Sequence, residues 1–149
     1  MTSERAAWAQ EAHRRLASAG YRSGEARSAV IDALAQAGGC VGAQELADRL
    51  RDAGRRVGTA SVYRTLGVLG ELELVRGRDV GEGVARYELV LPSGHHHHHV
   101  VCERCGATAA FEDDELEAAI DRAARRAPYA VRDHEVVLRG LCPACASKA

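Results

Sequence analysis

The chain has 149 residues, enough for one domain or two small ones. It has 20 Lys plus Arg against 21 Asp plus Glu, and the formal net charge of −1 excludes a globally basic nucleic-acid binder but allows a local basic face. Aromatic residues make up only 4% of the chain, so the cores are expected to be built from Ala, Leu and Val. Such cores bury little apolar area in a small domain, so a bound metal ion would add useful stability. No apolar run approaches membrane-spanning length, so no membrane partner is expected, and five Cys without a visible targeting segment predict a reducing cytoplasm.

The first half of the chain has the apolar periodicity of four helices. They are predicted at residues 4–18, 25–37, 43–53 and 60–72. Ser23 is a plausible N-cap for the second helix, and Thr59 for the fourth. Cys40 and Val41 are expected in a short loop between the second and third helices.

The start of the fourth helix carries small polar residues together with Tyr and Arg. The residues expected towards its outer face are Ser61, Tyr63, Arg64 and Thr65. Such residues suit a recognition helix, whose first turns enter the major groove of DNA. An ordinary solvated helix surface has a similar composition, so this pattern alone leaves both readings open.

Two short segments after this helix predict a β-hairpin. Residues 74–78 and 85–89 bracket a Gly-rich tip at 81–83. Helices followed by a hairpin predict a winged helix-turn-helix, in which Arg residues of the wing can reach phosphates. The Leu-Pro-Ser-Gly cluster at 91–94 is interpreted as a hinge between a domain at 1–90 and a second at 95–149.

The second domain opens with metal-ligand residues. Five histidines, at 95–99, run into the pair Cys102 and Cys105, and a second Cys-x-x-Cys pair follows at Cys142 and Cys145. Four thiolates at this spacing are the ligand set of a structural zinc site. Two disulfides are the alternative, which the spacing and the odd fifth Cys disfavour. An expression tag is disfavoured because the His run lies inside the chain.

The His run is expected to be extended, continuing into Val100–Cys102. Alternate histidines of a strand face opposite ways, so His95, His97 and His99 point one way and His96 and His98 the other. A second strand is predicted at 107–111, a helix capped by Asp113-Asp114 at 115–127, and a third strand at 129–141, broken near His134. A small sheet with open edges predicts pairing with a second copy in a twofold dimer.

These motifs, in this order, resemble those of the ferric uptake regulator family. The match rests on Ser-Val-Tyr-Arg-Thr-Leu at 61–66, the Gly-rich wing, Tyr-Glu-Leu at 87–89, the His run and the two Cys pairs. The resemblance implies an α+β protein with an N-terminal winged helix-turn-helix and a C-terminal α/β dimerisation domain. It also implies a homodimeric, metal-dependent repressor of palindromic double-stranded operator DNA.

The resemblance carries roles onto particular residues. Structural zinc is implied for Cys102, Cys105, Cys142 and Cys145. A second site in the same domain is implied for His96, His98, Glu117 and His134. A regulatory hinge site is implied for Cys40, Glu88, His97 and His99. DNA contacts are implied for Tyr63 and Arg64, with Arg22 in the minor groove, and the polar pattern of the helix start adds Ser61 as a candidate.

Cys40 departs from the family pattern, because many relatives place a His there. A thiolate beside two imidazoles favours Zn²⁺ over Fe²⁺, so the interpretation is a zinc-responsive repressor. Other zinc sensors place a Cys and an acid where this chain has Val90 and Arg76. Ala110 stands where peroxide sensors have an Asp, which argues against iron-catalysed histidine oxidation. Regulation by iron, nickel or another divalent metal, or by a redox-active Cys40, is the alternative.

Two other functions compete with a repressor. A zinc hydrolase would need an open metal position beside a base, and no His-Glu-x-x-His motif occurs, so the chain is not expected to be an enzyme. A metal-buffering or protein-binding module would share the metal sites but lack DNA affinity. Cys40 itself is, outside the family context, more often a small buried residue than a ligand.

Overall fold

The computed structural model describes residues 3–79, 83–92 and 97–148. The chain divides into two compact units, Met1–His96 and His97–Ala149, which are called unit 1 and unit 2 below. Both units combine helices with a three-stranded sheet, so the expected α+β class is confirmed. Among the described residues, no helix has the length and apolar character needed to cross a bilayer.

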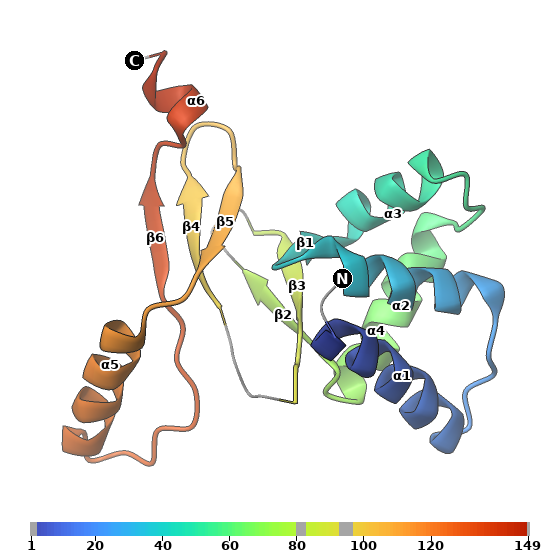
Figure 1. The fold of residues 1–149 in the computed structure, drawn as a ribbon, viewed down its shortest axis with the longest axis horizontal. Helices are drawn as coiled ribbons and strands as arrows, with labels where there is room; N and C mark the ends of the chain where they lie inside the picture. The colour runs from blue at the N-terminus through green and yellow to red at the C-terminus, as the bar shows by residue number, and fades with distance from the viewer. Residues whose placement is uncertain (1–2, 80–82, 93–96, 149) are drawn as a thin grey trace. The chain divides into compact units, whose positions relative to one another are not determined.

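Unit 1 contains the four expected helices (Figure 1). They are α1 (Ser3–Ser18), α2 (Glu25–Ala37), α3 (Ala43–Asp52) and α4 (Thr59–Glu71). The bounds agree with the predictions to within about a residue, but both predicted caps are wrong. Gly24 occupies the N-cap of α2 and Gly58 that of α4, neither with a side-chain cap bond, and Thr59 is already helical. Gly is among the residues favoured at N-caps, and it costs only a few tenths of a kcal/mol relative to a residue whose side chain caps the helix.

The hairpin predicted after α4 is confirmed. Strands β2 (Val75–Asp79) and β3 (Ala85–Leu89) are antiparallel, and residues 80–82 of the predicted tip lie outside the described residues. A third strand, β1 (Val41–Gly42), pairs with β3 in the order β1-β3-β2, with Val41 opposite Tyr87. The prediction of a loop at Val41 is therefore wrong, because two residues form a strand only when β3 supplies the partner.

One apolar core holds unit 1 together. It draws side chains from all four helices and all three strands, among them Trp8, Leu34, Leu46 and Leu69. Fully burying a side chain of this size contributes about 1.5–3 kcal/mol. The indole Nε1 of Trp8 donates a 2.9 Å hydrogen bond to the backbone carbonyl of Leu74, which ties α1 to the start of the wing. Thr65, expected on the outer face of α4, is buried instead.

Unit 2 is a sheet with a helix at either end (Figure 1). Its elements are β4 (His98–Cys102), β5 (Thr108–Phe111), α5 (Asp114–Arg126), β6 (Val137–Gly140) and α6 (Pro143–Ala146). The strand order is β5-β4-β6, with β4 antiparallel to β5 and parallel to β6. In Figure 1, α6 lies at the end where β4 and β6 finish, and α5 lies at the opposite end.

Three details of unit 2 test the predictions. The cap at Asp113 is confirmed, since its side chain accepts a 2.8 Å hydrogen bond from the backbone N–H of Leu116. The prediction of a long third strand at 129–141 is wrong, because residues 129–136 form no strand and β6 begins only at Val137. The short helix α6 was not expected; Pro143 at its first position suits a helix start.

Unit 2 has very little apolar interior of its own. Helix α5 has no buried residue, and the buried apolar side chains of the described part of unit 2 are Val101, Cys102 and Cys145. Large apolar side chains lie exposed instead, including Tyr129 and Leu138. A unit of this size with so small a core needs another source of stability, such as a metal ion or a partner chain.

Candidate metal centres and candidate nucleic-acid interface

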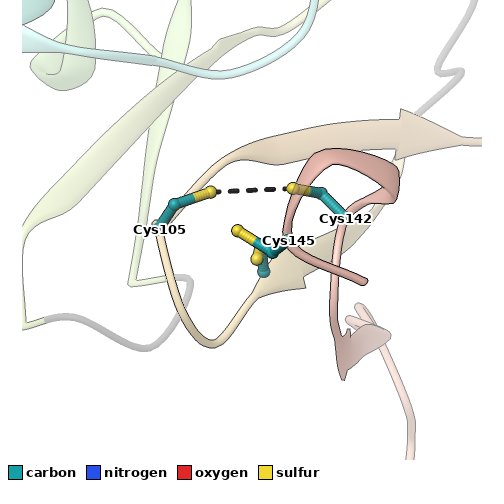
Figure 2. A group of neighbouring side chains, drawn as sticks. Cys105, Cys142 and Cys145 are labelled. Atoms are coloured by element: carbon teal, nitrogen blue, oxygen red, sulfur yellow. Dashed lines mark hydrogen bonds between the residues drawn. The ribbon is translucent and has the colours of Figure 1, made fainter. Parts of the chain in front are cut away.

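The four paired cysteines converge at one end of unit 2, and Figure 2 shows three of them, Cys105, Cys142 and Cys145. Cys102 ends β4, Cys105 lies in the turn that follows, and Cys142 and Cys145 lie at the start of α6 and within it. The Sγ atoms of Cys105 and Cys142 are 3.8 Å apart, and all four sulfur atoms lie within 4.8 Å of one another.

This spacing discriminates between the two chemical alternatives. Zinc–sulfur bonds of about 2.3 Å in a tetrahedron place sulfur atoms about 3.8 Å apart, whereas a disulfide requires about 2.05 Å. All five cysteines are free thiols. The arrangement of Cys102, Cys105, Cys142 and Cys145 therefore fits a tetrahedral ion and not two disulfides.

The backbone around each Cys pair forms a tight turn that aims both sulfur atoms inward. The N–H of Gly106 donates to the carbonyl of Cys102 at 2.9 Å, and the N–H of Cys145 donates to that of Cys142 at 3.0 Å. Gly106 adopts φ 73°, a left-handed conformation that glycine accepts without steric cost. Each Cys-x-x-Cys segment thus holds its two thiols ready for a shared ion.

The thiols in this cluster differ in acidity. Hydrogen bonds from the backbone of Cys142, and then of Cys105, lower the pKa of Cys102 to about 6. Hydrogen bonding with the Cys142 side chain, followed by desolvation, raises the pKa of Cys145 to about 12. A cluster of four neighbouring thiols does not ionise fully by itself, whereas a divalent cation stabilises all four as thiolates.

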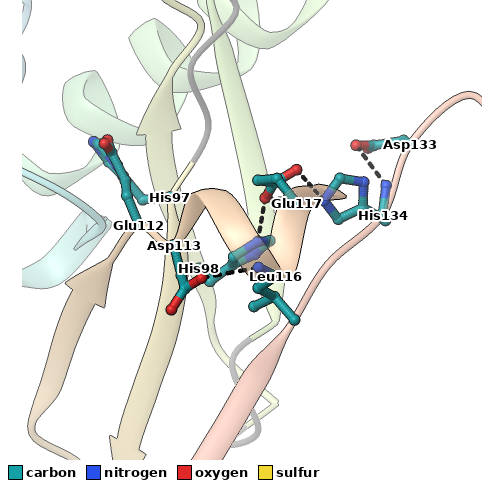
Figure 3. Close-up of polar contacts among 8 residues, drawn as sticks. All are labelled: His97, His98, Glu112, Asp113, Leu116, Glu117, Asp133 and His134. Carbon is teal, nitrogen blue, oxygen red and sulfur yellow. Dashed lines mark hydrogen bonds and ion pairs between the residues drawn. The ribbon is translucent and has the colours of Figure 1, made fainter. Parts of the chain in front are cut away.

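A second cluster forms around Glu117 of α5 (Figure 3). His98 Nε2 lies 2.5 Å from Glu117 Oε1, and His134 Nε2 lies 3.1 Å from Glu117 Oε2. Ligand atoms of all three residues lie within 4.8 Å of one another. Three of the four residues predicted for the second site therefore come together. The fourth, His96, lies outside the described residues.

His97, which precedes β4, and His99, which lies on it, have different surroundings. His97 Nδ1 lies 2.6 Å from Oε1 of Glu112, and Glu112 is the residue that follows β5 (Figure 3). His99 is 0% exposed and pairs with Ala110 on β5. Successive residues along a strand point to opposite faces, so His98 and His99 serve different faces of the sheet, as the alternation of the His run predicts.

Unit 1 contributes two side chains of the predicted hinge set. Val41 pairs with Tyr87 in the β1–β3 register, and this register brings Cys40 beside Glu88. The Sγ atom of Cys40 and a carboxylate oxygen of Glu88 lie within 4.8 Å of each other. Glu88 is buried and also forms an ion pair with Arg78. His97 and His99 belong to unit 2, so a four-residue hinge site stays a prediction.

The predicted DNA-contacting residues lie on the surface of unit 1. Tyr63 is 52% exposed and Arg64 is exposed beside it on α4, with Arg64 Nη2 3.3 Å from Ser61 Oγ. Arg22, between α1 and α2, is exposed as well. The polar and cationic start of α4 is therefore open to a ligand, as a recognition helix requires.

Two residues that contact the candidate ligands escaped the sequence predictions. Glu112, the partner of His97, could have been found from the alternation of β5, because it lies two positions beyond Ala110. Arg78, the partner of Glu88, could have been found from the register of the hairpin. Arg78 pairs with Arg86 on β3, so Glu88 is its diagonal neighbour.

Comparison with known proteins adds a family match. The model of the "Ferric uptake regulator family" matches residues 18–139. The chain is 37% identical over 134 residues to a "Zinc uptake regulation protein" of Mycobacterium tuberculosis, a match that covers 89% of this chain and all of the relative. It is also 37% identical over 93 residues to a "Ferric uptake regulation protein" of Bacillus subtilis, which covers 62% of each chain.

The fold is similar to that of solved structures. A crystal structure of the ferric uptake regulator of Vibrio cholerae superposes with a TM-score of 0.72 at 30% sequence identity. The superposition covers 87% of this chain and 98% of the Vibrio protein. The similarity therefore extends over both units and is not confined to the helical part.

Proposed function

Because the chain belongs to the ferric uptake regulator family, we propose that it is a metal-dependent transcriptional repressor that binds palindromic operator DNA as a homodimer. One observation carries the link between metal and DNA: Cys40 and Glu88, two ligand-type side chains, meet on the unit that carries the winged helix. Residues 1–90 would act as the DNA-binding domain, 91–94 as the hinge, and 95–149 as the dimerisation domain.

The structural metal we propose is zinc, held by Cys102, Cys105, Cys142 and Cys145. The 3.8 Å sulfur–sulfur separation and the free thiols support this assignment. Because unit 2 has few buried apolar side chains, a zinc ion that links β4 to α6 would contribute much of its stability. Free thiols of this kind persist in a reducing compartment, so we infer that the protein acts in the cytoplasm.

The regulatory metal would be held by Cys40 and Glu88 from unit 1 and by His97 and His99 from unit 2. A thiolate, two imidazoles and a carboxylate suit Zn²⁺, which we propose as the sensed ion. The zinc-named Mycobacterium relative, matched over its full length, supports this choice. The iron-named Bacillus relative is the observation that keeps Fe²⁺, or another divalent metal such as nickel, as the alternative.

The mechanism we propose depends on ligands from both units binding one ion. A bound dication supplies a cross-link between the side chains that hold it. The arrangement in which Cys40 and Glu88 meet His97 and His99 would then gain population over other arrangements, because a ligand shifts an equilibrium only through its difference in affinity for the states. That arrangement would set the spacing of two recognition helices on a twofold operator.

The DNA contacts are assigned to the exposed start of α4. We propose that Tyr63 and Arg64 reach bases and phosphates in the major groove, with Ser61 beside them. Arg22 would enter the minor groove. Tyr63 is a large side chain on α4 that is 52% exposed, which supports a role in binding.

The homodimer would form through unit 2. The exposed large apolar side chains in the described part of unit 2 are Tyr129 and Val131 before β6, Leu138 on β6 and Leu141 just after it. Covering them with a second copy would also bury the amphipathic helix α5, which has acidic residues in its first turn and basic ones in its last. We infer a regulator and not an enzyme, because no His-Glu-x-x-His motif supplies a base beside a metal ion.

Zinc-dependent DNA binding tests the proposal. The zinc-loaded protein would first be used to select duplexes from a random pool, and mobility shifts would then be measured with EDTA and with added zinc. The parent should bind DNA only when zinc is added. DNA binding by Cys40→Ser should not respond to zinc, and this variant should still sediment as a dimer. A Cys40→Ser protein that responds to zinc as the parent does would remove Cys40 from the site. Titration with Fe²⁺ and Ni²⁺, under reducing and oxidising conditions, separates the alternatives.

A further inference from the structure

A buried ion pair lies in unit 1 beside the proposed hinge ligands. Arg78 on β2 and Glu88 on β3 approach to 3.4 Å between Nε and Oε2, and their side chains are only 7% and 8% exposed. Arg and Glu are rarely buried to this extent unless they are paired. Their surroundings are otherwise those of a small domain whose interior is apolar.

The same carboxylate faces a second candidate partner. An oxygen of Glu88 lies within 4.8 Å of the thiol sulfur of Cys40. Another cation, Arg86, also approaches this segment, with its Nη2 3.4 Å from the carbonyl oxygen of Cys40. Arg86 itself forms an ion pair with Glu45 at 2.8 Å. Glu88 is therefore shared between Arg78 and the position that a metal would take.

We propose that Arg78 is the resident counter-ion of Glu88 and competes with the metal ion for this carboxylate. The inference rests on the proposed hinge site and names a residue that regulates it. A buried carboxylate needs a positive partner, and an Arg guanidinium stays protonated at every physiological pH. Arg78 supplies that partner when no metal is bound.

Competition follows from the charges. A dication held by Cys40 and Glu88 shares its carboxylate with a guanidinium or displaces it, and both cost free energy. Arg78 thus weakens metal binding at the hinge site and raises the metal concentration at which the protein responds. Removing the charge of Arg78 is expected to tighten metal binding even though it removes an interaction from the folded protein.

Zinc affinity separates this competition from a purely structural ion pair. Arg78→Gln would be compared with the parent and with Arg51→Gln, which removes an exposed Arg that pairs with Asp48 on the surface. The zinc that is lost in Cys40→Ser would be titrated against a chromogenic chelator, with every protein carrying Glu117→Gln so that the ion expected at Glu117 does not contribute. We expect Arg78→Gln to bind this zinc about tenfold more tightly or better and Arg51→Gln to match the parent within about twofold. Equal or weaker binding by Arg78→Gln would overturn the competition.

A second measurement requires no metal-binding curve. In EDTA, thermal unfolding followed by circular dichroism should show a lower Tm for Arg78→Gln than for the parent, because the buried Glu88 loses its ion pair with Arg78. Added zinc should raise the Tm of Arg78→Gln by more than that of the parent. If Arg78→Gln folds only when zinc is present, zinc has replaced the missing cation, as proposed. If it fails to fold with zinc as well as without, Arg78 is a structural residue and the proposal is wrong.

The outcome also distinguishes this proposal from the function on which it rests. If Cys40→Ser binds one zinc fewer than the parent, the hinge site is supported, and unchanged affinity in Arg78→Gln then overturns only the role of Arg78. A parent that binds no zinc through Cys40 overturns the hinge site, and the role of Arg78 with it.

Discussion

The Nδ1 atom of His97 lies 2.6 Å from the carboxylate of Glu112, within unit 2. A carboxylate on one ring nitrogen fixes the orientation and tautomer of an imidazole and leaves the other nitrogen as the ligand atom. Glu112 therefore presents Nε2 of His97, the nitrogen that would hold the hinge metal. This carboxylate comes from the residue just beyond β5, whereas Ala110, on the strand itself, offers no ligand.

We expect Glu112→Ala to weaken zinc binding at the hinge site by about tenfold and to leave the zinc of the four cysteines in place. Chelator competition measures both. Glu115→Ala, which removes an exposed acid from the first turn of α5, is the matched control. Hinge affinity that is the same in Glu112→Ala and the parent would show that the His97–Glu112 contact is incidental to metal binding.

Removal of one paired cysteine is expected to unfold unit 2. Structural zinc contributes about 10–16 kcal/mol of apparent binding free energy in small zinc domains, and unit 2 has few buried apolar side chains to replace it. Cys142→Ser should lose one zinc per chain and sediment as a monomer, whereas Cys40→Ser should retain that zinc. Elemental analysis and sedimentation check these results. A dimeric Cys142→Ser protein without this zinc would contradict the structural role.

Substitutions at the start of α4 should weaken DNA binding without weakening the fold. Tyr63 and Arg64 are exposed, so replacing either with Ala should change the free energy of unfolding by less than about 0.5 kcal/mol. Loss of a specific base contact costs about 1–3 kcal/mol, and loss of a phosphate contact lowers the salt slope by about 1. Filter binding at several salt concentrations measures both. Glu71→Ala, at the far end of the same helix, should bind as the parent does.

The cluster around Glu117 predicts a third metal per chain. His98 and His134 both contact the Glu117 carboxylate, and three ligands of this kind suit a divalent ion. With saturating zinc we expect three ions per chain in the parent and two in Glu117→Gln. Equal zinc contents in the two proteins would assign His98, Glu117 and His134 to hydrogen bonding within unit 2.

The sequence predicted elements whose signal is local. Apolar periodicity located α2 to the residue, and the spacing of the Cys pairs identified four residues that the fold brings together. Strand β1 was missed because Val41 and Gly42 have no periodicity of their own and pair only with β3. The extended stretch from Tyr129 was overestimated, because residues that favour a strand still need a ladder partner, which β4 offers only from Val137 onward.

The partners of the candidate ligands show where local reasoning ends. The ligand sets themselves came from spacing and family resemblance. Arg78 and Glu112 can be assigned as contacts only from the β2–β3 register and from the alternation of β5 continued past Phe111, and not from composition or motif spacing. Both are charged residues that composition alone would place in solvent, and each contacts a residue of the proposed hinge site.

Trp8 lies in the core of unit 1, with its indole bonded to the carbonyl of Leu74, and the sequence contains no other tryptophan. Intrinsic fluorescence excited at the indole band therefore originates in the helical half of the molecule alone. Its emission will shift to longer wavelength when α1 detaches from the wing, and it will not register events confined to the zinc-binding half. Trp8 fluorescence thus reports the unfolding of unit 1 separately from that of unit 2.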